Sequence, residues 1–482
     1  MSKFYITNAI PYVNAKPHIG HALEFVQSDV IARYHKLLGD ETLLLCGGDE
    51  NALKNVQAAE KAKRPIQEFI DENTESFYTL SKKLNVQFDV WQKGSDAKHH
   101  SSSQKLWKLC DKNGDIYKKK YKGLYCVGCE LFYAESELDK NGECLEHPGK
   151  RLELVEEENY FFKLSKYQSQ LEKILSSGEL EIVPTFRKNE MLEFLKRGLL
   201  DISISRSNER AKNWGVDVPD DPSQKMYVWF DALNIYQSGI GFGADEKQYN
   251  KWWPADLHVV GKGILKFHAI YWPAFLLSAG LKLPKKIFVH EYITVNNQKM
   301  SKTIGNVIDP IPLIEKYGAD ALRYYFLAKI SPFSDGDFTE DKLKQTYNSD
   351  LANGLGNLVA RVAKLCEKNS VNIERARRKH INGLLEDIKT PLEQFKFNEA
   401  LDLIWGNIKG LDQYINRERP WQKDLSQSNQ VLSNIIIGTE SLISLTDIVE
   451  TLRIFLPETA EKIESQFKGP KITSQKPLFP RM

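Results

Sequence analysis

The sequence predicts an α/β protein whose last part is all α-helical. An apolar, β-branched run at residues 4–7 precedes a helical pattern from Pro17 to about Leu38, and further strand-like runs lie at 42–45 and 287–290. A cysteine-bearing segment interrupts this alternation between about residues 114 and 225. After Phe338, long helical patterns dominate and strand signals are few.

The composition limits the class of protein. A chain of 482 residues suits several domains. Charged residues make up 27% of it, yet the formal net charge is only +2, so any contact with RNA must come from local patches. We expect no membrane span, because no apolar run is long enough to cross a bilayer. We expect no secretory or transit peptide, because the chain enters a strand almost at once. Six cysteines do not make a disulfide framework in a chain of this length, which favours a cytoplasmic location.

The string His18-Ile19-Gly20-His21 opens the first predicted helix, with Pro17 suited to its first position. Unpaired N–H groups and the positive end of the helix dipole should face any anion bound there. The two imidazoles can donate hydrogen bonds to phosphate, and Gly20 leaves room for a flat base. A histidine pair that only caps or packs is an equal alternative for these four residues.

The string Lys299-Met300-Ser301-Lys302-Thr303 follows the strand at 287–290 and a turn at Asn296-Asn297. It has neither a helical nor a strand period, which predicts a mobile loop. Ammonium groups on flexible stems can follow phosphate oxygens as charge moves. A solvated surface turn is the commoner use of paired lysines and remains the alternative.

Both strings resemble the signatures of class I aminoacyl-tRNA synthetases. The first, with Pro11-Tyr12-Val13-Asn14 in front, is similar to the form in methionyl-tRNA synthetases, and the second has Thr303 where Ser is usual. The resemblance runs from about Tyr5 to about Trp421. It implies a Rossmann-like parallel nucleotide-binding fold, split by a zinc-bearing insertion and followed by an all-α anticodon-binding domain. The implied divisions are a catalytic domain in two halves (1–113 and 226–298), the insertion (114–225), a signature-loop segment (299–349), the helical domain (350–467) and a tail (468–482).

The resemblance also implies the residues that bind ATP. The catalytic groups would be His18 and His21 on one side of the triphosphate and Lys299 and Lys302 on the other. The full ATP-binding set is His18, Gly20, His21, Gly261, His290, Lys299, Ser301 and Lys302. Mg²⁺ would arrive with ATP, because no acidic cage is evident.

Cys126-x-x-Cys129 followed by Cys144-x-x-His147 has the spacing of one structural zinc site per chain, with three thiolates and an imidazole as ligands. Two unrelated cysteine pairs with an incidental histidine are the alternative. By resemblance, a zinc-bearing insertion here shapes the entrance for the acceptor end of tRNA. The acidic run at 156–158 predicts a solvated loop or helix end.

Two aromatic-rich segments are candidates for a substrate pocket. Residues 227–233 predict a strand running into a helix, and residues 266–273 predict a helix that ends at Pro273. Ordinary core packing would explain both, but the resemblance places them at a methionine pocket. Tyr12 and His268 could then offer weak donors to the thioether sulfur. The implied methionine-binding residues are Ile10, Tyr12, Asp49, Arg206, Trp229, Ala232, Leu233, Tyr236, Phe267, His268 and Trp272.

Within this set, Asp49 would anchor the α-amino group and Arg206 would orient Asp49. Asp49 follows a predicted strand, where a carboxylate faces the ligand crevice of an α/β sheet, although turn capping is a common use of Asp. Two positions depart from the family pattern. Asn51-Ala52 stands in place of His-Gly, and Gly263 stands where many members carry an Asp that meets the ATP ribose.

The helical part carries a candidate set for unstacked anticodon bases: Asn357, Arg361 and Trp421. Asn357 and Arg361 share a helix face. An amide, a guanidinium and an exposed aromatic can read and stack bases, although a surface pair with a core tryptophan is the commoner arrangement. The spacing resembles the family's readers of a CAU anticodon. The segment Leu478-Phe479-Pro480 resembles a tail that packs back between domains, with a disordered end as the alternative. The family's dimerisation module does not follow, which favours a monomer.

The sequence therefore predicts an enzyme that activates L-methionine with ATP and transfers it to the 3′ end of tRNA(Met). Three alternatives remain open: a class I synthetase for another amino acid, a small-molecule nucleotidylyltransferase and a non-catalytic RNA-binding relative.

Overall fold

The computed structural model describes residues 2–126, 131–133, 138–144, 152–300, 305–371, 383–439 and 442–482. The chain forms two compact units, each built from several segments. Unit 1 comprises residues 1–17, 39–79 and 87–290, and unit 2 comprises residues 18–38, 80–86 and 291–482. The domain boundaries predicted from the sequence stay predictions.

Unit 1 is built on a parallel sheet with the strand order β3-β2-β1-β12-β13-β7. This confirms the predicted α/β class, and the strands expected at 4–7, 42–45 and 287–290 all form. The strands are β1 (Lys3–Asn8), β2 (Glu41–Gly48), β3 (Val90–Lys93), β7 (Glu181–Val183), β12 (Leu257–Gly261) and β13 (Lys286–His290).

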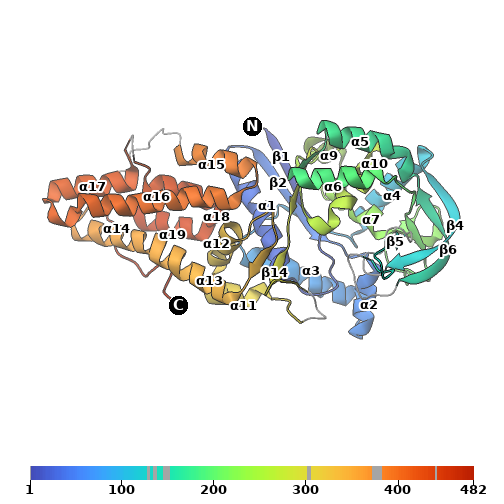
Figure 1. Ribbon diagram of the computed structural model, residues 1–482, viewed down its shortest axis with the longest axis horizontal. Coiled ribbons are helices and arrows are strands. Elements are labelled where there is room, and N and C mark those ends of the chain that lie inside the picture. The colour runs from blue at the N-terminus through green and yellow to red at the C-terminus, as the bar shows by residue number, and fades with distance from the viewer. Residues whose placement is uncertain are drawn as a thin grey trace. The chain divides into compact units, whose positions relative to one another are not determined.

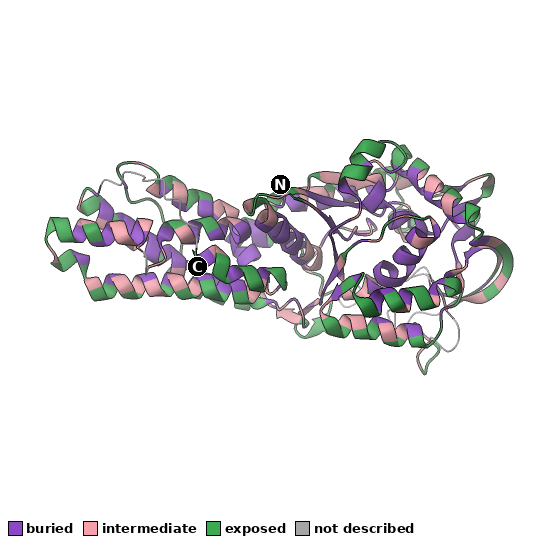
Figure 2. Cartoon of the chain, turned by 90° about the horizontal axis from the view of Figure 1, so that it is seen from above, coloured by how far each residue is buried: buried purple, intermediate pink, exposed green. Residues whose placement is uncertain are grey.

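Helices connect and cover these strands, and their apolar side chains form the core together with the sheet. Figure 2 shows buried residues on the strands and on one face of the surrounding helices. The helices of unit 1 are α2 (Leu53–Lys61), α4 (Ala97–Lys112), α5 (Gln168–Ser177), α6 (Thr185–Lys196), α7 (Val228–Ala232), α8 (Ile235–Ser238), α9 (Glu246–Trp252) and α10 (Trp272–Ser278), with a 3₁₀ turn at Leu164–Tyr167. Helix α3 (Ile66–Lys83) continues from unit 1 into the 80–86 segment of unit 2.

The segment between α4 and α5 forms most of a separate antiparallel sheet with the order β5-β4-β6-β8, in which β8 follows α6. Its long ribbon pairs β4 (Ile116–Cys126) with β6 (Glu153–Phe162) over ten residue pairs (Figure 1). The shorter strands are β5 (Leu131–Tyr133) and β8 (Ile202–Ser203). The expectation of a loop or helix end at 156–158 is wrong. These glutamates lie in β6, where Glu156 and Glu158 pair across the ribbon with Lys122 and Lys120. Opposite charges that face each other across two strands stabilise this exposed ribbon. The run of acidic residues alone does not predict a strand, because the lysines lie elsewhere in the sequence.

A third, small sheet in unit 1 precedes α7. It consists of β9 (Ser205–Ser207), β10 (Asp217–Val218) and β11 (Asp221–Met226), in the order β10-β11-β9. The strand predicted to enter residues 227–233 therefore ends earlier, at Met226, and Tyr227 is the N-cap of α7.

Unit 2 contains the first predicted helix, α1 (Ile19–Leu37), and nearly everything after residue 290. Its small sheet has the order β15-β14-β16, from β14 (Ile293–Val295), β15 (Gln298–Lys299) and β16 (Gly336–Phe338). Asn296 and Asn297 form the turn between β14 and β15, both with positive φ, as a two-residue hairpin requires.

The part after Phe338 is helical, as predicted. Figure 1 shows α14, α16, α17 and α19 running alongside one another. The helices of unit 2 after α1 are α11 (Pro310–Tyr317), α12 (Ala319–Lys329), α13 (Glu340–Thr346), a π-helical stretch (Tyr347–Gly356), α14 (Asn357–Lys368), α15 (Gly383–Glu393), α16 (Phe397–Glu418), a 3₁₀ turn (Pro420–Gln422), α17 (Leu425–Ile437), α18 (Leu445–Phe455) and α19 (Pro457–Phe467).

The tail packs on this helical part. The Phe479 ring lies 5.8 Å from the Tyr347 ring, edge to face, and Asn348 exchanges two hydrogen bonds with the backbone of Met482. These contacts favour the packed tail over the disordered alternative. Among the described residues, no helix combines the length and apolar character needed to span a bilayer.

Candidate functional site

The first signature forms the N-terminus of α1. His18 is the N-cap, and Pro17 lies just before it instead of at the first helical position. The Gly20 N–H donates to His18 Nδ1 at 3.1 Å, and the His18 N–H donates to His21 Nδ1 at 3.1 Å. The Ile19 N–H donates to the Ile308 carbonyl at 3.1 Å. The expectation of unpaired N–H groups at this turn is therefore wrong, because two of these donors go to the histidine rings and the Ile19 N–H goes to the Ile308 carbonyl.

The same contacts fix the histidine tautomers. Nδ1 of both rings accepts a backbone N–H, so in the neutral form each ring carries its proton on Nε2. The two rings stack with their centroids 3.9 Å apart. Capping and phosphate binding are thus compatible, since the cap uses Nδ1 and directs an Nε2–H donor away from the helix end.

Met300 of the second signature lies close to Gly20 of the first signature, within unit 2. A Cβ placed on Gly20 would lie 3.5 Å from Met300 Cε and 2.9 Å from His18 Cε1. The Met300 distance is ordinary van der Waals contact, whereas a side chain at position 20 would displace the capping imidazole of His18. Lys299 ends β15 and pairs with Thr294, so the expectation that it lacks strand structure is wrong. Ser301 and Lys302 lie outside the described residues.

In unit 1, residues predicted for ligand binding gather where the parallel strands end. Ile10 follows β1 and Asp49 follows β2, while Gly261 and His290 pair across the last positions of β12 and β13. Ligands in open α/β sheets bind at this carboxyl edge. Gly263 lies in a 3₁₀ turn, Lys262–Ile264, immediately after β12.

The aromatic residues of the predicted methionine pocket form one wall. The Trp229 ring stacks on Phe267 at 3.7 Å and meets the Tyr12 ring edge to face at 6.2 Å. Ala232, Leu233 and Trp272 are buried in the same core. Lys54 Nζ lies 3.0 Å from the centre of the Tyr12 ring, which holds that ring in place.

His268 is a buried member of this wall, and both of its ring nitrogens are used. Nδ1 lies 2.9 Å from the Ile264 carbonyl, and Nε2 lies 2.8 Å from the Tyr236 hydroxyl. Burial lowers the pKa of His268 to about 4, against the opposing effect of the Ile264 hydrogen bond, so the ring is neutral near pH 7. A carbonyl only accepts, so Nδ1 carries the proton and Tyr236 donates to Nε2. The expectation that His268 donates to a thioether is therefore wrong for this arrangement, in which His268 accepts a hydrogen bond from the Tyr236 hydroxyl.

The predicted helix at 266–273 does not end at its proline. Residues Phe267–Tyr271 form a π-helical turn, and Pro273 lies in the first turn of α10, which continues to Ser278. A π-helical turn shifts the backbone hydrogen bonds, and a proline is tolerated where its missing N–H has no partner to lose.

Asp49 and Arg206 are both buried side chains of unit 1. Asp49 is held by its backbone: its N–H donates to the Pro11 carbonyl at 2.9 Å, and its carbonyl accepts from Asn55 Nδ2 at 2.8 Å. Arg206 donates to Ser203 Oγ and the Ser205 carbonyl, and its guanidinium lies 4.7 Å from the centre of the Tyr227 ring. A small cavity lies beside it, lined in part by Asn51 and Tyr125.

The predicted zinc ligands are described only in part. Cys126 ends β4, Cys144 follows a turn, and both thiols are buried. Cys144 Sγ lies 3.3 Å from the Tyr133 hydroxyl. Cys129 and His147 lie outside the described residues.

Two of the three predicted anticodon residues, Arg361 and Trp421, lie side by side. Asn357 and Arg361 lie one turn apart on α14. The Arg361 guanidinium lies 5.1 Å from the centre of the Trp421 ring and bonds Asp412 and Asn416 at 2.9 and 2.7 Å. Trp421 is 44% exposed, which excludes the alternative of a core tryptophan.

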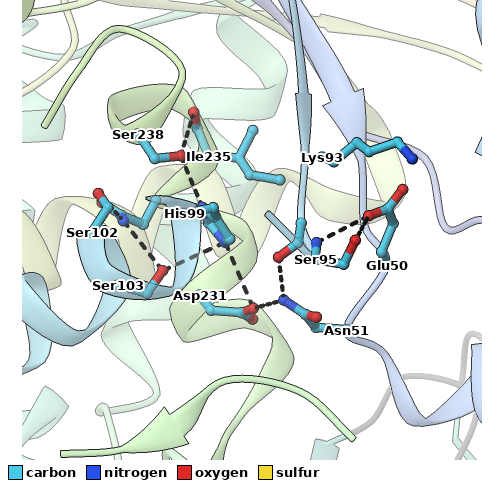
Figure 3. Close-up of polar contacts among 12 residues, drawn as sticks. Glu50, Asn51, Lys93, Ser95, His99, Ser102, Ser103, Asp231, Ile235 and Ser238 are labelled. Atoms are coloured by element: carbon cyan, nitrogen blue, oxygen red, sulfur yellow. Dashed lines mark hydrogen bonds and ion pairs between the residues drawn. The ribbon is translucent and has the colours of Figure 1, made fainter. Parts of the chain in front are cut away.

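A buried polar cluster beside the pocket was not predicted. Asp231 lies within the pocket helix α7 and accepts a hydrogen bond from Asn51 Nδ2 at 2.6 Å (Figure 3). His99 Nε2 lies 3.7 Å from the same carboxylate oxygen. One acidic residue inside the apolar run 227–233 was the sequence signal for this cluster.

Comparison with known proteins identifies the family. A family model described as tRNA synthetases class I (M) matches residues 4–151 and 140–363. The methionine–tRNA ligase of Thermotoga maritima is 41% identical over 474 residues, covering 96% of this chain and 74% of that protein. The corresponding ligase of a Nostoc species is 40% identical, covering 90% of this chain and 84% of that protein.

A solved structure supports the same assignment. The Mycobacterium tuberculosis methionyl-tRNA synthetase in complex with methionyl-adenylate superposes with a TM-score of 0.91 at 34% identity, covering 100% of both chains. With the signature residues, the parallel sheet and the aromatic pocket already in place, the chain belongs to the class I tRNA synthetases, in the methionine (M) family.

Proposed function

We propose that this chain is a methionine–tRNA ligase, which activates L-methionine with ATP and charges tRNA(Met). The observation that carries this proposal is an aromatic wall of the buried Trp229 and Phe267 and the partly buried Tyr12, which forms a β-bridge with Asp49. A thioether is polarizable and packs well against aromatic rings, while a carboxylate at a strand end suits an ammonium group.

The first step is nucleotidyl transfer. A carboxylate oxygen of methionine attacks the α-phosphorus of ATP, the bond to the β-phosphate oxygen breaks, and pyrophosphate leaves. His18 and His21 donate Nε2–H hydrogen bonds to the phosphates, and Lys299 and Lys302 neutralise the leaving pyrophosphate. Gly20, Gly261, His290 and Ser301 complete the proposed nucleotide contacts. Mg²⁺ bound with ATP would screen the phosphate charge.

The second step is acyl transfer. A terminal ribose hydroxyl of tRNA attacks the carbonyl carbon of methionyl-adenylate, and AMP leaves. No residue of the chain forms a covalent intermediate, so catalysis depends on alignment and on charge stabilisation. Asn357, Arg361 and Trp421 bind the anticodon, and the helical part is the anticodon-binding domain.

Pyrophosphate exchange against a panel of amino acids tests the function. Exchange with methionine and not with leucine or cysteine is expected, because the polarizable aromatic wall suits an unbranched thioether. Exchange driven by another amino acid would refute the pocket assignment. Exchange with none of them would favour an RNA-binding relative or a nucleotidylyltransferase for another substrate.

We also propose that the 114–225 segment binds one structural zinc ion through Cys126, Cys129, Cys144 and His147. Two buried thiols in this segment fit zinc chemistry, since thiolates are soft ligands. A closed site of four protein ligands would support the fold of the insertion and take no part in the reaction. Metal analysis of purified protein should find about one zinc per chain for a four-ligand site. Cys144→Ser should lose it, and Cys366→Ser, a buried thiol outside the insertion, should keep it. A metal-free wild-type protein would refute the site.

A further inference from the structure

The side chain of Asn51 joins three segments of unit 1. Its Nδ2 donates to the Gly94 carbonyl at 2.8 Å and to Asp231 Oδ2 at 2.6 Å. Figure 3 shows Asn51 between the segment that follows β3 and helix α7. An amide nitrogen has two hydrogens, and both are used in these bonds. Asn51 therefore connects the end of β2, the end of β3 and the pocket helix.

Asp231 depends on this bond. The residue is 2% exposed, and its Oδ1 has no hydrogen-bond partner within the described ranges. A buried carboxylate is costly unless hydrogen bonds or opposite charge compensate it. Oδ2 receives the Asn51 amide and faces His99 Nε2 at 3.7 Å, beyond hydrogen-bonding distance. The Asn51 amide is thus the short hydrogen bond that compensates this carboxylate.

His99 has a fixed place in the cluster. Its Nδ1 lies 2.8 Å from Ser238 Oγ on α8, and its Nε2 lies 3.5 Å from Ser103 Oγ. Asn234 donates to Ser102 and Ser103. Helices α4 and α8 are thereby held together beside Asp231, and the Asn51 bond is a side-chain hydrogen bond that connects α7 to the strand ends.

Both residues of that hydrogen bond are close in sequence to proposed methionine-binding residues. Asn51 is two residues after Asp49, the proposed ammonium ligand. Asp231 lies between Trp229 and Ala232, which form part of the pocket wall. The ammonium group and the thioether of one methionine are a fixed number of bonds apart, so Asp49 and Trp229 must keep a matching separation.

We propose that Asn51 and Asp231 are positioning residues that set the separation between the ammonium ligand and the thioether wall. The pair acts through Asp49 and Trp229 and does not contact the reacting atoms. This inference rests on the proposed function, because it assigns a cause to methionine affinity. It also gives a role to Asn51, which stands where the family pattern has histidine.

Steady-state pyrophosphate exchange with the wild-type protein and four variants tests the pair, with thermal unfolding measured in parallel. Asn51→Ala removes the bond and should raise KM for methionine about tenfold, the factor expected for losing a hydrogen bond to a charged group, with KM for ATP within about twofold of wild type. Asp231→Asn keeps an oxygen that can accept from Asn51, so its KM for methionine should stay within about threefold of wild type.

The double variant Asn51→Ala/Asp231→Asn separates positioning from stability. It removes the uncompensated buried charge, so its thermal stability should exceed that of Asn51→Ala, yet it lacks the connection and should retain the raised KM for methionine. If Asn51→Ala does not fold, KM for methionine is measured on the double variant in its place. If the double variant recovered both the thermal stability and the wild-type KM for methionine, the pair would have a purely structural role and the inference would be overturned.

Asn113→Ala is the matched control. Asn113 Nδ2 donates to the buried carboxylate of Asp115 at 2.7 Å, outside the pocket, so KM for methionine should not change. An unchanged KM in folded Asn51→Ala would refute the inference while leaving the proposed function intact. Absence of methionine-dependent exchange by the wild-type protein would instead refute the proposed function.

Discussion

His268 and His258 are buried histidines that the native state holds neutral. Burial lowers the pKa of His268 to about 4 and lowers the pKa of His258 well below its usual range, with the neighbouring His268 adding to that shift. His258 also bonds Thr7 Oγ1 through Nδ1. Because the Tyr236 hydroxyl donates to His268, the orientation of the pocket wall depends on this neutral form.

The free energy of unfolding should therefore fall as the pH is lowered from about 6.5 to about 4. In this range the unfolded chain binds protons at positions 258 and 268 and the folded chain does not, so stability present above pH 6.5 is lost. His268 alone should account for on the order of 3 kcal/mol, from a pKa difference of about 2.5 units. Urea unfolding as a function of pH measures this loss. His268→Gln should show a smaller loss over the same interval, and an equal loss in both proteins would contradict the assignment.

Single residues were predictable from the sequence where a motif carried them. His18 and His21 were assigned to a helix start, and the structure places them there. Their use as caps was left open, because the choice between capping and ligand contact depends on side-chain rotamers that a motif does not specify. Asn51 and Asp231 lie 180 positions apart, and only the folded chain brings them together.

Helix α14 and the 3₁₀ turn at Pro420–Gln422 carry the residues that we propose for base binding. Trp421 is exposed and lies against the Arg361 guanidinium, which Asp412 and Asn416 hold in place. A preorganised cation beside an exposed ring offers a stacking surface with a fixed edge for hydrogen bonds.

Trp421→Ala should raise KM for tRNA(Met) roughly 10- to 100-fold, the range that corresponds to losing one base–aromatic stack. Methionine-dependent pyrophosphate exchange should remain at the wild-type rate, because that reaction needs no tRNA. Aminoacylation and exchange assays on the same preparation measure the two effects. Leu403→Ala, which truncates another exposed apolar side chain of the helical part, should change neither. An equal loss in both reactions would contradict the anticodon role.

Elements were predicted well where a periodic pattern was long. The strands β1, β2 and β13 and helix α1 occupy the predicted positions within a few residues. The pattern failed where a tertiary partner decides the structure: Glu156 and Glu158 form a strand because β4 supplies lysines opposite them. Pro273 likewise sits inside a helical run because a π-helical turn precedes it.

Unit 2 is assembled from segments that lie far apart in the sequence. Residues 18–38 and 80–86 form one compact unit with residues 291–482. One side chain, Arg323 of α12, connects these segments. It donates through Nε to the Phe455 carbonyl at 2.7 Å and through a terminal nitrogen to the Leu84 carbonyl at 3.1 Å, and it pairs with Asp29 of α1 at 2.8 Å.

Arg323→Ala should therefore destabilise the whole of unit 2. Arg323 and Asp29 are 0% and 1% exposed, so the substitution removes one of the two arginines that pair with a buried carboxylate and takes the Arg323 donors away from two carbonyls. Removing one partner of a buried pair costs about 3–5 kcal/mol. Arg323→Lys should recover only part of this loss, because a single ammonium cannot reach partners on three elements as a guanidinium does.

Urea unfolding measures both variants against the control Arg417→Ala. The Arg417 side chain is 71% exposed and pairs with Glu418, so its removal should cost less than about 1 kcal/mol. If Arg323→Ala cost no more than Arg417→Ala, the three segments would have to be held together by apolar packing alone.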